Sequence, residues 1–457
     1  MLTVLAVLLV ASAAFGLARH RALAVANGKP SALHSRPVHH AVYAALLAAG
    51  PALALWAVWA VFSPLVLRWI VEASLPPELL AQGPELRRFF MSTVLRLASG
   101  LPPTGEVTPD LAAAAAYYSR LSSFGSLAVL VGSVCLALVL ARLALSRISL
   151  EMRARNAVES WFTTALWISA AISIATTAGI VFSVLFESMR FFQFVPVSEF
   201  LFGLQWSPQI ALRADQVAGS GAFGAVPLFA GTLLVTVIAM AVAGPIGMLS
   251  AIFLSQYASP AFRDVAKPVL EVLAGIPTVV YGFFAALVVA PWVRGFGESL
   301  GLDVSSESAL AAGVVMGIMI IPFVSSLADD AIMAVPQAMR DGSLALGATR
   351  AETISQVLIP AALPGIVAGF LLAISRAIGE TMIVVMAAGM AANLTANPLA
   401  SVTTVTVQIV TLLVGDQEFD SPKTLSAFAL GLTLFVVTLG LNVIALYVLQ
   451  RFREQYE

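Results

Sequence analysis

The chain has 457 residues, of which 60% are hydrophobic and only 11% are charged. Soluble globular domains have about 25% charged residues, so the composition excludes an ordinary soluble protein. The chain has 24 basic and 25 acidic residues and no polybasic segment, which argues against nucleic-acid binding. Its single cysteine excludes an intrachain disulfide. The composition therefore favours a polytopic membrane protein.

Apolar runs recur along the whole chain, and most are long enough to cross a bilayer as a helix. They predict an all-α polytopic membrane protein with about nine transmembrane helices. The runs cover roughly residues 2–18, 41–67, 123–141, 161–186, 226–254, 268–293, 308–327, 361–392 and 424–449.

The charges around these runs predict an orientation. Basic residues follow the first run, at Arg19 and Arg21, instead of preceding it. A secretory signal has the reverse order, so we expect a retained anchor with its N-terminus in the periplasm and, after nine spans, a cytoplasmic C-terminus. With this orientation, 14 of the 24 Lys and Arg residues lie in cytoplasmic segments and nine in periplasmic ones, as the positive-inside rule favours.

Composition divides the chain into two predicted domains. Residues 1–150 hold three spans and a polar outer stretch at 72–122, which contains a predicted periplasmic helical segment. Residues 151–457 hold six spans and a polar inner loop at 329–360. The apolar residues that predict one face of the periplasmic helix are Leu86, Phe89, Phe90, Val94 and Leu97.

Two charged residues, Arg376 and Glu380, lie in the middle of the apolar run 361–392. Each charge costs about 2.5 to 3.5 kcal/mol at the centre of a span, so the pair should face protein or a wet pathway. A spacing of four predicts one face of a helix. One interpretation is an ion pair that only fixes helix packing. The other is a substrate pathway, because an Arg fork suits phosphate-like oxyanions and the carboxylate offsets its charge.

The inner loop at 329–360 has helix start and stop signals. They predict a break at Pro336, a helix to Leu346, a left-handed turn at Gly347, a second helix from about Arg350 and a new span opened by Pro360. Such an elbow could dock into a partner. On these signals alone, a solvated loop remains an equal alternative.

Other polar and helix-breaking residues have weaker signals. Gly275, Pro277 and Gly282 interrupt an apolar helix; they permit either close packing or a gating movement. The four histidines lack carboxylate companions, so no metal site is predicted. A Ser/His/Asp or paired-carboxylate arrangement with catalytic spacing is also missing from the sequence, so we do not expect an enzyme.

The segment DGSLALGATRAETISQVLIP, at 341–360, resembles the EAA loop of ABC-importer permeases. Asp341, Gly342 and Ser343 stand where that pattern has Glu-Ala-Ala, Gly347 matches its glycine, and Pro360 closes it. The substitutions at 341–343 depart from the pattern. The spacing from the glycine to the proline follows it.

Further segments resemble the PstC-type permease subunits of phosphate ABC importers, in the same order along residues 160–457. They are VPLFAGTLLVTVIAMAVAGPIGMLSAIFLSQYA (226–258), KPVLEVLAGIPTVVYGFFA (267–285), MGIMIIPFVSSLADD (316–330) and SRAIGETMIVVMAAG (375–389). The resemblance implies a six-helix core of the type I ABC-importer permease. The first 150 residues look like the N-terminal extension of longer family members.

The resemblance implies roles for individual residues. Arg376 and Glu380 match the charged pair used in phosphate passage. The coupling region that contacts the ATPase would include Asp341, Gly342, Ser343, Gly347, Ala348 and Thr349. No Walker A pattern occurs in the sequence, so ATP would be hydrolysed by another chain, and we expect this chain to bind no cofactor.

The resemblance also implies partners and location. These are a homologous PstA-type permease, a PstB-type ATPase dimer, a periplasmic PstS-type phosphate-binding protein and the lipid of a bacterial inner membrane. We therefore expect half of a transmembrane pathway that imports inorganic phosphate by alternating access. Two alternatives remain: an ion-coupled secondary anion transporter, and an ABC permease for a related oxyanion.

Overall fold

The computed structural model describes residues 2–75, 84–102, 107–209, 221–414 and 421–451. These ranges are almost entirely helical, with one antiparallel pair of two-residue strands. Nine of the helical segments described are long and apolar enough to cross a membrane. The predicted all-α fold with nine spans is confirmed. The chain divides into two compact units, residues 1–175 and 176–457.

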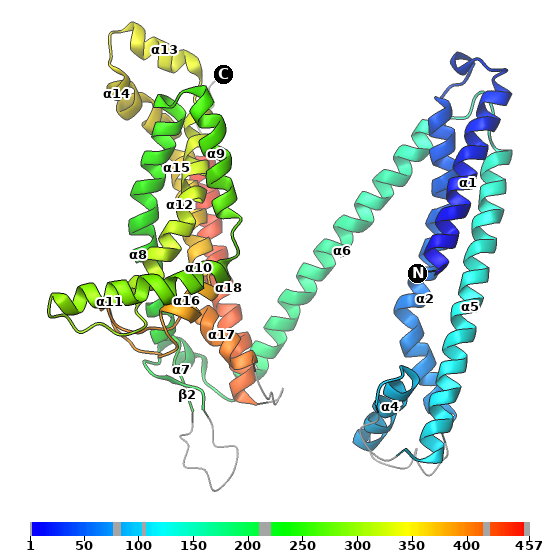
Figure 1. Cartoon of the computed structure of the whole chain (residues 1–457), viewed down its shortest axis with the longest axis horizontal. Helices are drawn as coiled ribbons and strands as arrows, with labels where there is room; N and C mark the ends of the chain where they lie inside the picture. Colours follow the sequence, from blue (N-terminus) through cyan, green and yellow to red (C-terminus); the bar gives the residue numbers. More distant parts are fainter. Residues whose placement is uncertain (1, 76–83, 103–106, 210–220, 415–420, 452–457) are drawn as a thin grey trace. The chain divides into compact units, whose positions relative to one another are not determined.

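The first unit is a bundle of long helices, with α4 packed against α5 (Figure 1). Its helices are α1 (Leu2–Val25), the 3-10 turn η1 (Pro30–Ala32), α2 (Pro37–Ala73), α4 (Pro84–Ala98), α5 (Pro109–Ser146) and the first part of α6 (Ala154–Phe191). Small residues line the contacts: α1 buries Ala11, Ala14, Ala18 and Ala22. Such residues let membrane helices approach closely.

The short helix α4 confirms the helical segment predicted within 72–122. Its buried face holds Met91 and Val94, with Phe90 and Leu97 partly buried beside them. Phe89 was predicted on this face, but its side chain is 56% exposed. The side chain of Leu86 lies outside the described residues. The helical phase is therefore shifted, so that Met91 takes the inward position.

The second unit begins within α6 and holds the remaining spans. Its elements are α7 (Val197–Phe202), β1 (Trp206–Ser207), β2 (Ala222–Phe223), α8 (Val226–Ile252), the π-helix η2 (Phe253–Tyr257), α9 (Pro260–Ala274), α10 (Thr278–Phe284), the π-helix η3 (Ala285–Val289), α11 (Ala290–Ser299), α12 (Ala309–Met333), α13 (Gln337–Ala345), α14 (Arg350–Glu352), the π-helix η4 (Thr353–Leu358), α15 (Ile359–Ile378), α16 (Met382–Ala387), α17 (Val405–Leu413) and α18 (Pro422–Arg451). Figure 1 shows α13 and α14 at one end of this unit and α7 with β2 at the opposite end.

Helix α12 forms the centre of the second unit. In its most apolar stretch 61% of the residues are buried, whereas the corresponding stretch of α6 has none. Glycines allow its close contact with α8: an added Cβ at Gly317 would lie 2.8 Å from the Ala239 carbonyl oxygen. α12 also packs on α15 and α16. α12 is thus the most buried of the nine spans that the structure describes, and it holds the residues that position the candidate site.

The run 361–392 does not form the single helix that the sequence predicted. α15 ends at Ile378, and a short helix, α16, starts at Met382. The chain then runs without regular structure to α17. Two hydrogen bonds hold this segment to the protein: Val402 N–H donates to the Ala388 carbonyl, and Val405 N–H, at the start of α17, donates to Thr232 Oγ1.

The run 268–293 is also interrupted. α9 ends at Ala274 and α10 begins at Thr278, so the membrane-crossing segment is Thr278–Ser299. The helix break predicted at Gly275 and Pro277 is confirmed: Gly275 ends α9 and Pro277 precedes α10. Gly282 breaks no helix and lies buried inside α10.

Candidate functional site

Arg376 lies near the C-terminal end of α15, with its side chain exposed on the surface of the chain. Its guanidinium carbon is 5.8 Å from the centre of the Phe323 ring, within the range of a cation–π contact. Phe323 stands close to the middle of α12, which runs from Ala309 to Met333. The guanidinium is therefore level with the middle of a membrane-crossing helix.

A second contact fixes the end of α15. Ser375 Oγ donates a hydrogen bond to Asn442 Oδ1 of α18 at 3.1 Å. A polar contact between membrane helices adds roughly 1 kcal/mol and sets the helices' relative rotation. Because Ser375 directly precedes Arg376, this contact restricts the direction in which the guanidinium emerges.

Glu380 follows the end of α15, so the prediction that it shares a helical face with Arg376 is wrong. Within the described residues the two side chains form no ion pair. Instead, Glu380 Oε1 accepts hydrogen bonds from the backbone N–H of Met382 at 3.0 Å and of Ile383 at 3.5 Å. The carboxylate thus caps the start of α16. α15 ends at Ile378, and Gly379 is its C-cap residue.

Of the predicted kink residues, Gly282 lies next to α16. Tyr281 Oη donates to the Leu273 carbonyl at 2.9 Å, which bridges the break between α9 and α10. An added Cβ at Gly282 would lie 2.7 Å from Met386 Sδ and 3.1 Å from the Met382 carbonyl oxygen. A larger residue would force Met386 to move, so glycine permits this close contact between α10 and the helix that Glu380 caps.

The loop from Met333 to α15 forms the predicted helical elbow. α13 follows Pro336, and Gly347 has φ +89°, the left-handed conformation predicted for it. Thr349 forms a reciprocal capping box with Glu352. Ser343 Oγ and Thr353 Oγ1 are 3.0 Å apart and close the elbow from inside.

The structure brings most of the predicted coupling residues to one exposed end of the unit. Asp341, Gly342, Gly347 and Thr349 are exposed, while Ser343 and Ala348 are half-buried. Gly342 lies within α13, where its Cα hydrogen faces open space. The six residues are thus gathered around a single turn, on a surface that a partner can reach.

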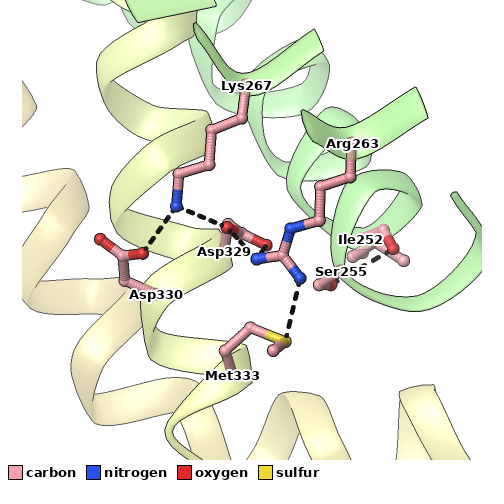
Figure 2. A network of polar contacts seen from close by, with 7 residues as sticks. All are labelled: Ile252, Ser255, Arg263, Lys267, Asp329, Asp330 and Met333. Carbon is pink, nitrogen blue, oxygen red and sulfur yellow. Dashed lines mark hydrogen bonds and ion pairs between the residues drawn. The ribbon is translucent and has the colours of Figure 1, made fainter. Parts of the chain in front are cut away.

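An ion-pair network that the sequence analysis did not identify joins α9 to α12 (Figure 2). Arg263 Nη2 donates to both oxygens of Asp329, at 2.9 and 3.2 Å, and Lys267 Nζ donates to Asp329 at 3.0 Å and to Asp330 at 3.1 Å. The Asp329 side chain is only 3% exposed. Its hydrogen bond raises the pKa of Lys267 above the ordinary value. Two cations thus compensate one buried carboxylate.

A sequence signal for this network existed. Asp329 and Asp330 are consecutive acids inside the last turns of an apolar helix, where an unpaired charge is costly. Their partners are more than 60 residues earlier in the chain, so spacing could not identify them. Among the described residues, no group of three or more His, Cys, Asp or Glu side chains could hold a metal ion.

Known protein families match both halves of the chain. The family described as phosphate ATP-binding cassette transporter matches residues 4–176. The family described as binding-protein-dependent transport system inner membrane component matches residues 243–454. The second match contains the elbow, Arg376 and Glu380.

Individual relatives agree with these matches. A probable ABC transporter permease protein of Bacillus subtilis, YqgH, is 33% identical over 240 residues, which are 52% of this chain and 74% of the relative. The phosphate transport system permease protein PstC of Mesorhizobium japonicum is 30% identical over 247 residues, 50% of this chain and 74% of the relative. The probable phosphate transport system permease protein PstC of Methanocaldococcus jannaschii is 29% identical over 283 residues, 59% of this chain and 89% of the relative.

A solved structure of the MetNI methionine ABC transporter in an inward-facing conformation is also similar. It has a TM-score of 0.35 and 17% identity, and the similarity covers 49% of this chain and 94% of that one. The family matches exclude the ion-coupled secondary transporter considered above, and a permease of this kind is not itself an ATPase. The chain belongs to the inner-membrane permease subunits of binding-protein-dependent ABC importers, with an N-terminal domain described for phosphate ABC transporters.

Proposed function

We propose that this permease conducts inorganic phosphate into the cytoplasm by alternating access and supplies half of the transmembrane pathway. The observation that carries the proposal is the position of Arg376: an exposed guanidinium level with the middle of α12, beside Phe323. A charge at that depth facing lipid would be heavily penalised. A wet pathway shared with a second permease is the environment in which its exposure is tolerated.

The chemistry of Arg376 suits a phosphate-type cargo. A guanidinium is charged at every physiological pH and offers a planar fork of donors to two oxyanion oxygens. The ring of Phe323 lies within cation–π range of that fork. The Glu380 carboxylate accepts hydrogen bonds from the backbone of α16, so its negative charge would temper the attraction from a short distance along the chain without occupying the fork. A pathway needs such moderate binding, because the cargo must also leave.

The broken helices provide a mechanical connection. Asp329 holds α9 to α12, while the break at Gly275 and Pro277 separates α9 from α10. We propose that α10 pivots at this break. Because Gly282 packs against Met386, a movement of α10 would displace α16 and the Glu380 carboxylate that caps it. This movement would open or close the pathway beside Arg376.

The elbow would couple this movement to ATP hydrolysis on another polypeptide. Its exposed residues, with the rigid turn at Gly347, suit docking into an ATPase. We propose a PstB-type ATPase dimer, a PstA-type second permease and a PstS-type phosphate-binding protein as partners, because the named relatives of this chain include phosphate transport system permeases. Residues 151–457 would form the transport half and residues 1–150 an extension.

This arrangement requires a periplasmic N-terminus and a cytoplasmic C-terminus. A reporter that is active only in the periplasm should be active when inserted at Gly100, after α4, and inactive at Ser343, in the elbow. The reverse pattern would refute the orientation.

The cargo is tested by uptake into proteoliposomes that contain this chain, its partner permease, the ATPase and the binding protein. Radiolabelled phosphate should accumulate with ATP, and excess unlabelled phosphate should abolish the signal while sulfate leaves it unchanged. Accumulation of sulfate in place of phosphate would assign the pathway to a related oxyanion.

A further inference from the structure

A cavity of about 130 Å³ lies inside the elbow, between α13, α14 and the two π-helices η2 and η4. α13 and α14 form the end of the unit in Figure 1. Polar lining groups come from Gln256, Arg340, Arg350 and Thr353, and apolar walls include Leu344. π-helical turns occur often at functional sites, and this cavity has one on each of two sides.

Two donors on the cavity residues have no partner. Gln256 Nε2 and Arg340 Nε are buried, and neither forms a hydrogen bond in the part of the chain that the structure describes. Buried donors are rarely left unpaired in proteins, because desolvation without a hydrogen bond is costly. Here both unpaired donors belong to side chains of the same cavity.

The charge of the cavity identifies the class of ligand. Arg340 and Arg350 both line it, and its lining residues include no Asp or Glu. Water could occupy the cavity and bond its donors, but it would not compensate the charge of the half-buried Arg340. A tetrahedral oxyanion would satisfy both the donors and the charge, and guanidinium groups bind phosphate-type oxygens strongly.

We infer that this cavity binds a phosphate-type oxyanion that fixes the elbow. The ligand would bridge α13, through Arg340, to α14, through Arg350, and to η2, through Gln256. α13 and α14 flank the left-handed turn at Gly347, so an occupied cavity would hold these two arms of the elbow at one angle. Free phosphate in the cytoplasm and the phosphate of an anionic lipid headgroup share the required chemistry.

This site is separate from the proposed pathway. Arg376 lies at the far end of α15, roughly 25 Å from the elbow at 1.5 Å per helical residue. The occupancy of the elbow cavity therefore does not depend on which cargo passes Arg376. Variants at Arg340 and at Arg376 can therefore distinguish the failure of the cavity proposal from the failure of the pathway proposal.

The test uses the full purified chain in detergent, with inorganic phosphate as the probe and hydrogen–deuterium exchange as the readout. Phosphate should slow the exchange of residues 337–358 in the wild type and in Arg376→Gln. Arg340→Gln should raise the phosphate concentration needed for half-maximal protection at least tenfold, and Arg340→Lys should have an intermediate effect. Gln256→Leu, which keeps the charge, should also weaken it. Arg294→Gln, which removes one charge from an exposed pair on α11, is the matched control and should leave it unchanged.

A second arm identifies the source of the oxyanion. The same exchange is measured in nanodiscs of zwitterionic lipid and in nanodiscs with added phosphatidylglycerol. Protection by phosphatidylglycerol alone, lost in Arg340→Gln, would assign the site to lipid headgroups, and protection only by added phosphate would assign it to the free ion. Three results would overturn the inference. These are no protection by either phosphate or phosphatidylglycerol, protection of a well-folded Arg340→Gln variant equal to that of the wild type, and loss of protection in Arg376→Gln.

Discussion

The guanidinium of Arg376 lies 5.8 Å from the centre of the Phe323 ring, and the two residues come from different membrane-crossing segments, α15 and α12. This contact places a positive charge level with the middle of the best-buried helix of the chain. It also ties the end of α15 to α12, because the guanidinium and the ring are within the range of a cation–π contact.

The Phe323 contact should affect cargo affinity. Replacement by Leu keeps an apolar side chain and removes the ring, whereas Tyr keeps the ring. A cation–π contact at an accessible site is worth about 0.5 to 1 kcal/mol, so Phe323→Leu should raise the KM for uptake roughly two- to fivefold, and Phe323→Tyr should stay near the wild type. Equal KM values for all three proteins would show that the contact does not position Arg376 for the cargo.

Glu380 should act through both its charge and its capping oxygen. Glu380→Gln keeps an oxygen that can accept from Met382 N–H, so the chain should fold normally while transport falls. Glu380→Ala removes the cap as well, and loss of a helix cap costs about 0.5 to 2 kcal/mol. Thermal unfolding of the purified variants should therefore show a lower Tm than the wild type for Glu380→Ala and an unchanged Tm for Glu380→Gln. An equally lowered Tm for both variants would contradict the capping role.

The turn at Gly347 should be needed for coupling. A β-branched residue at φ +89° is strained by roughly 1 to 2 kcal/mol, whereas Asn tolerates this conformation better. Gly347→Val should therefore uncouple ATP hydrolysis from uptake, and Gly347→Asn should retain most coupling. The ratio of ATP hydrolysed to phosphate imported measures the effect. Normal coupling in Gly347→Val, with normal membrane insertion, would mean that the turn has no role in coupling.

Asp329 should stabilise the second unit far more than its neighbour Asp330. Asp329→Asn leaves Arg263 and Lys267 facing a buried neutral group, which should cost about 3 kcal/mol. Asp330→Asn removes a pair in which the carboxylate is 64% exposed, worth at most about 1 kcal/mol. Thermal unfolding in detergent at pH 7 should show a clearly larger fall in Tm for Asp329→Asn, and similar falls would contradict the network.

The choice of pH 7 for comparing Asp329→Asn with Asp330→Asn follows from the raised pKa of Lys267. Because Asp329 raises the pKa of Lys267 in the folded chain, the pair's contribution to stability is complete below the unfolded pKa of about 10.5. It declines only as the pH rises through the higher folded value. At pH 7 the full contribution is therefore present.

Local signals in the sequence were sufficient for the spans and the elbow. Hydropathy alone predicted nine crossing segments, and Pro336 and Gly347 predicted the ends of α13 and the turn after it. These features depend on residues close together in the chain: a proline restricts its own backbone and that of the residue before it, and a glycine is favoured at a positive φ.

Distant contacts determined what the sequence could not predict. The run 361–392 is apolar throughout, so hydropathy gave no sign that the helix stops at Ile378. At the break, Thr406 Oγ1, from 26 residues further along the chain, donates a hydrogen bond to the Glu380 carbonyl. Asp329 was likewise interpreted as the start of a loop, because its partners Arg263 and Lys267 come from another helix.

The most direct test of the account is phosphate uptake by the Arg376→Gln variant in proteoliposomes with the partner permease, ATPase and binding protein. Protein levels and Tm are matched to the wild type, because loss of a charge near mid-membrane can also change folding. Arg376→Gln should nearly abolish uptake while the binding protein still captures phosphate, and Arg376→Lys, which keeps the charge and loses the fork, should give an intermediate rate. Wild-type uptake by a well-folded Arg376→Gln variant would contradict the account and leave Arg376 with a structural role only.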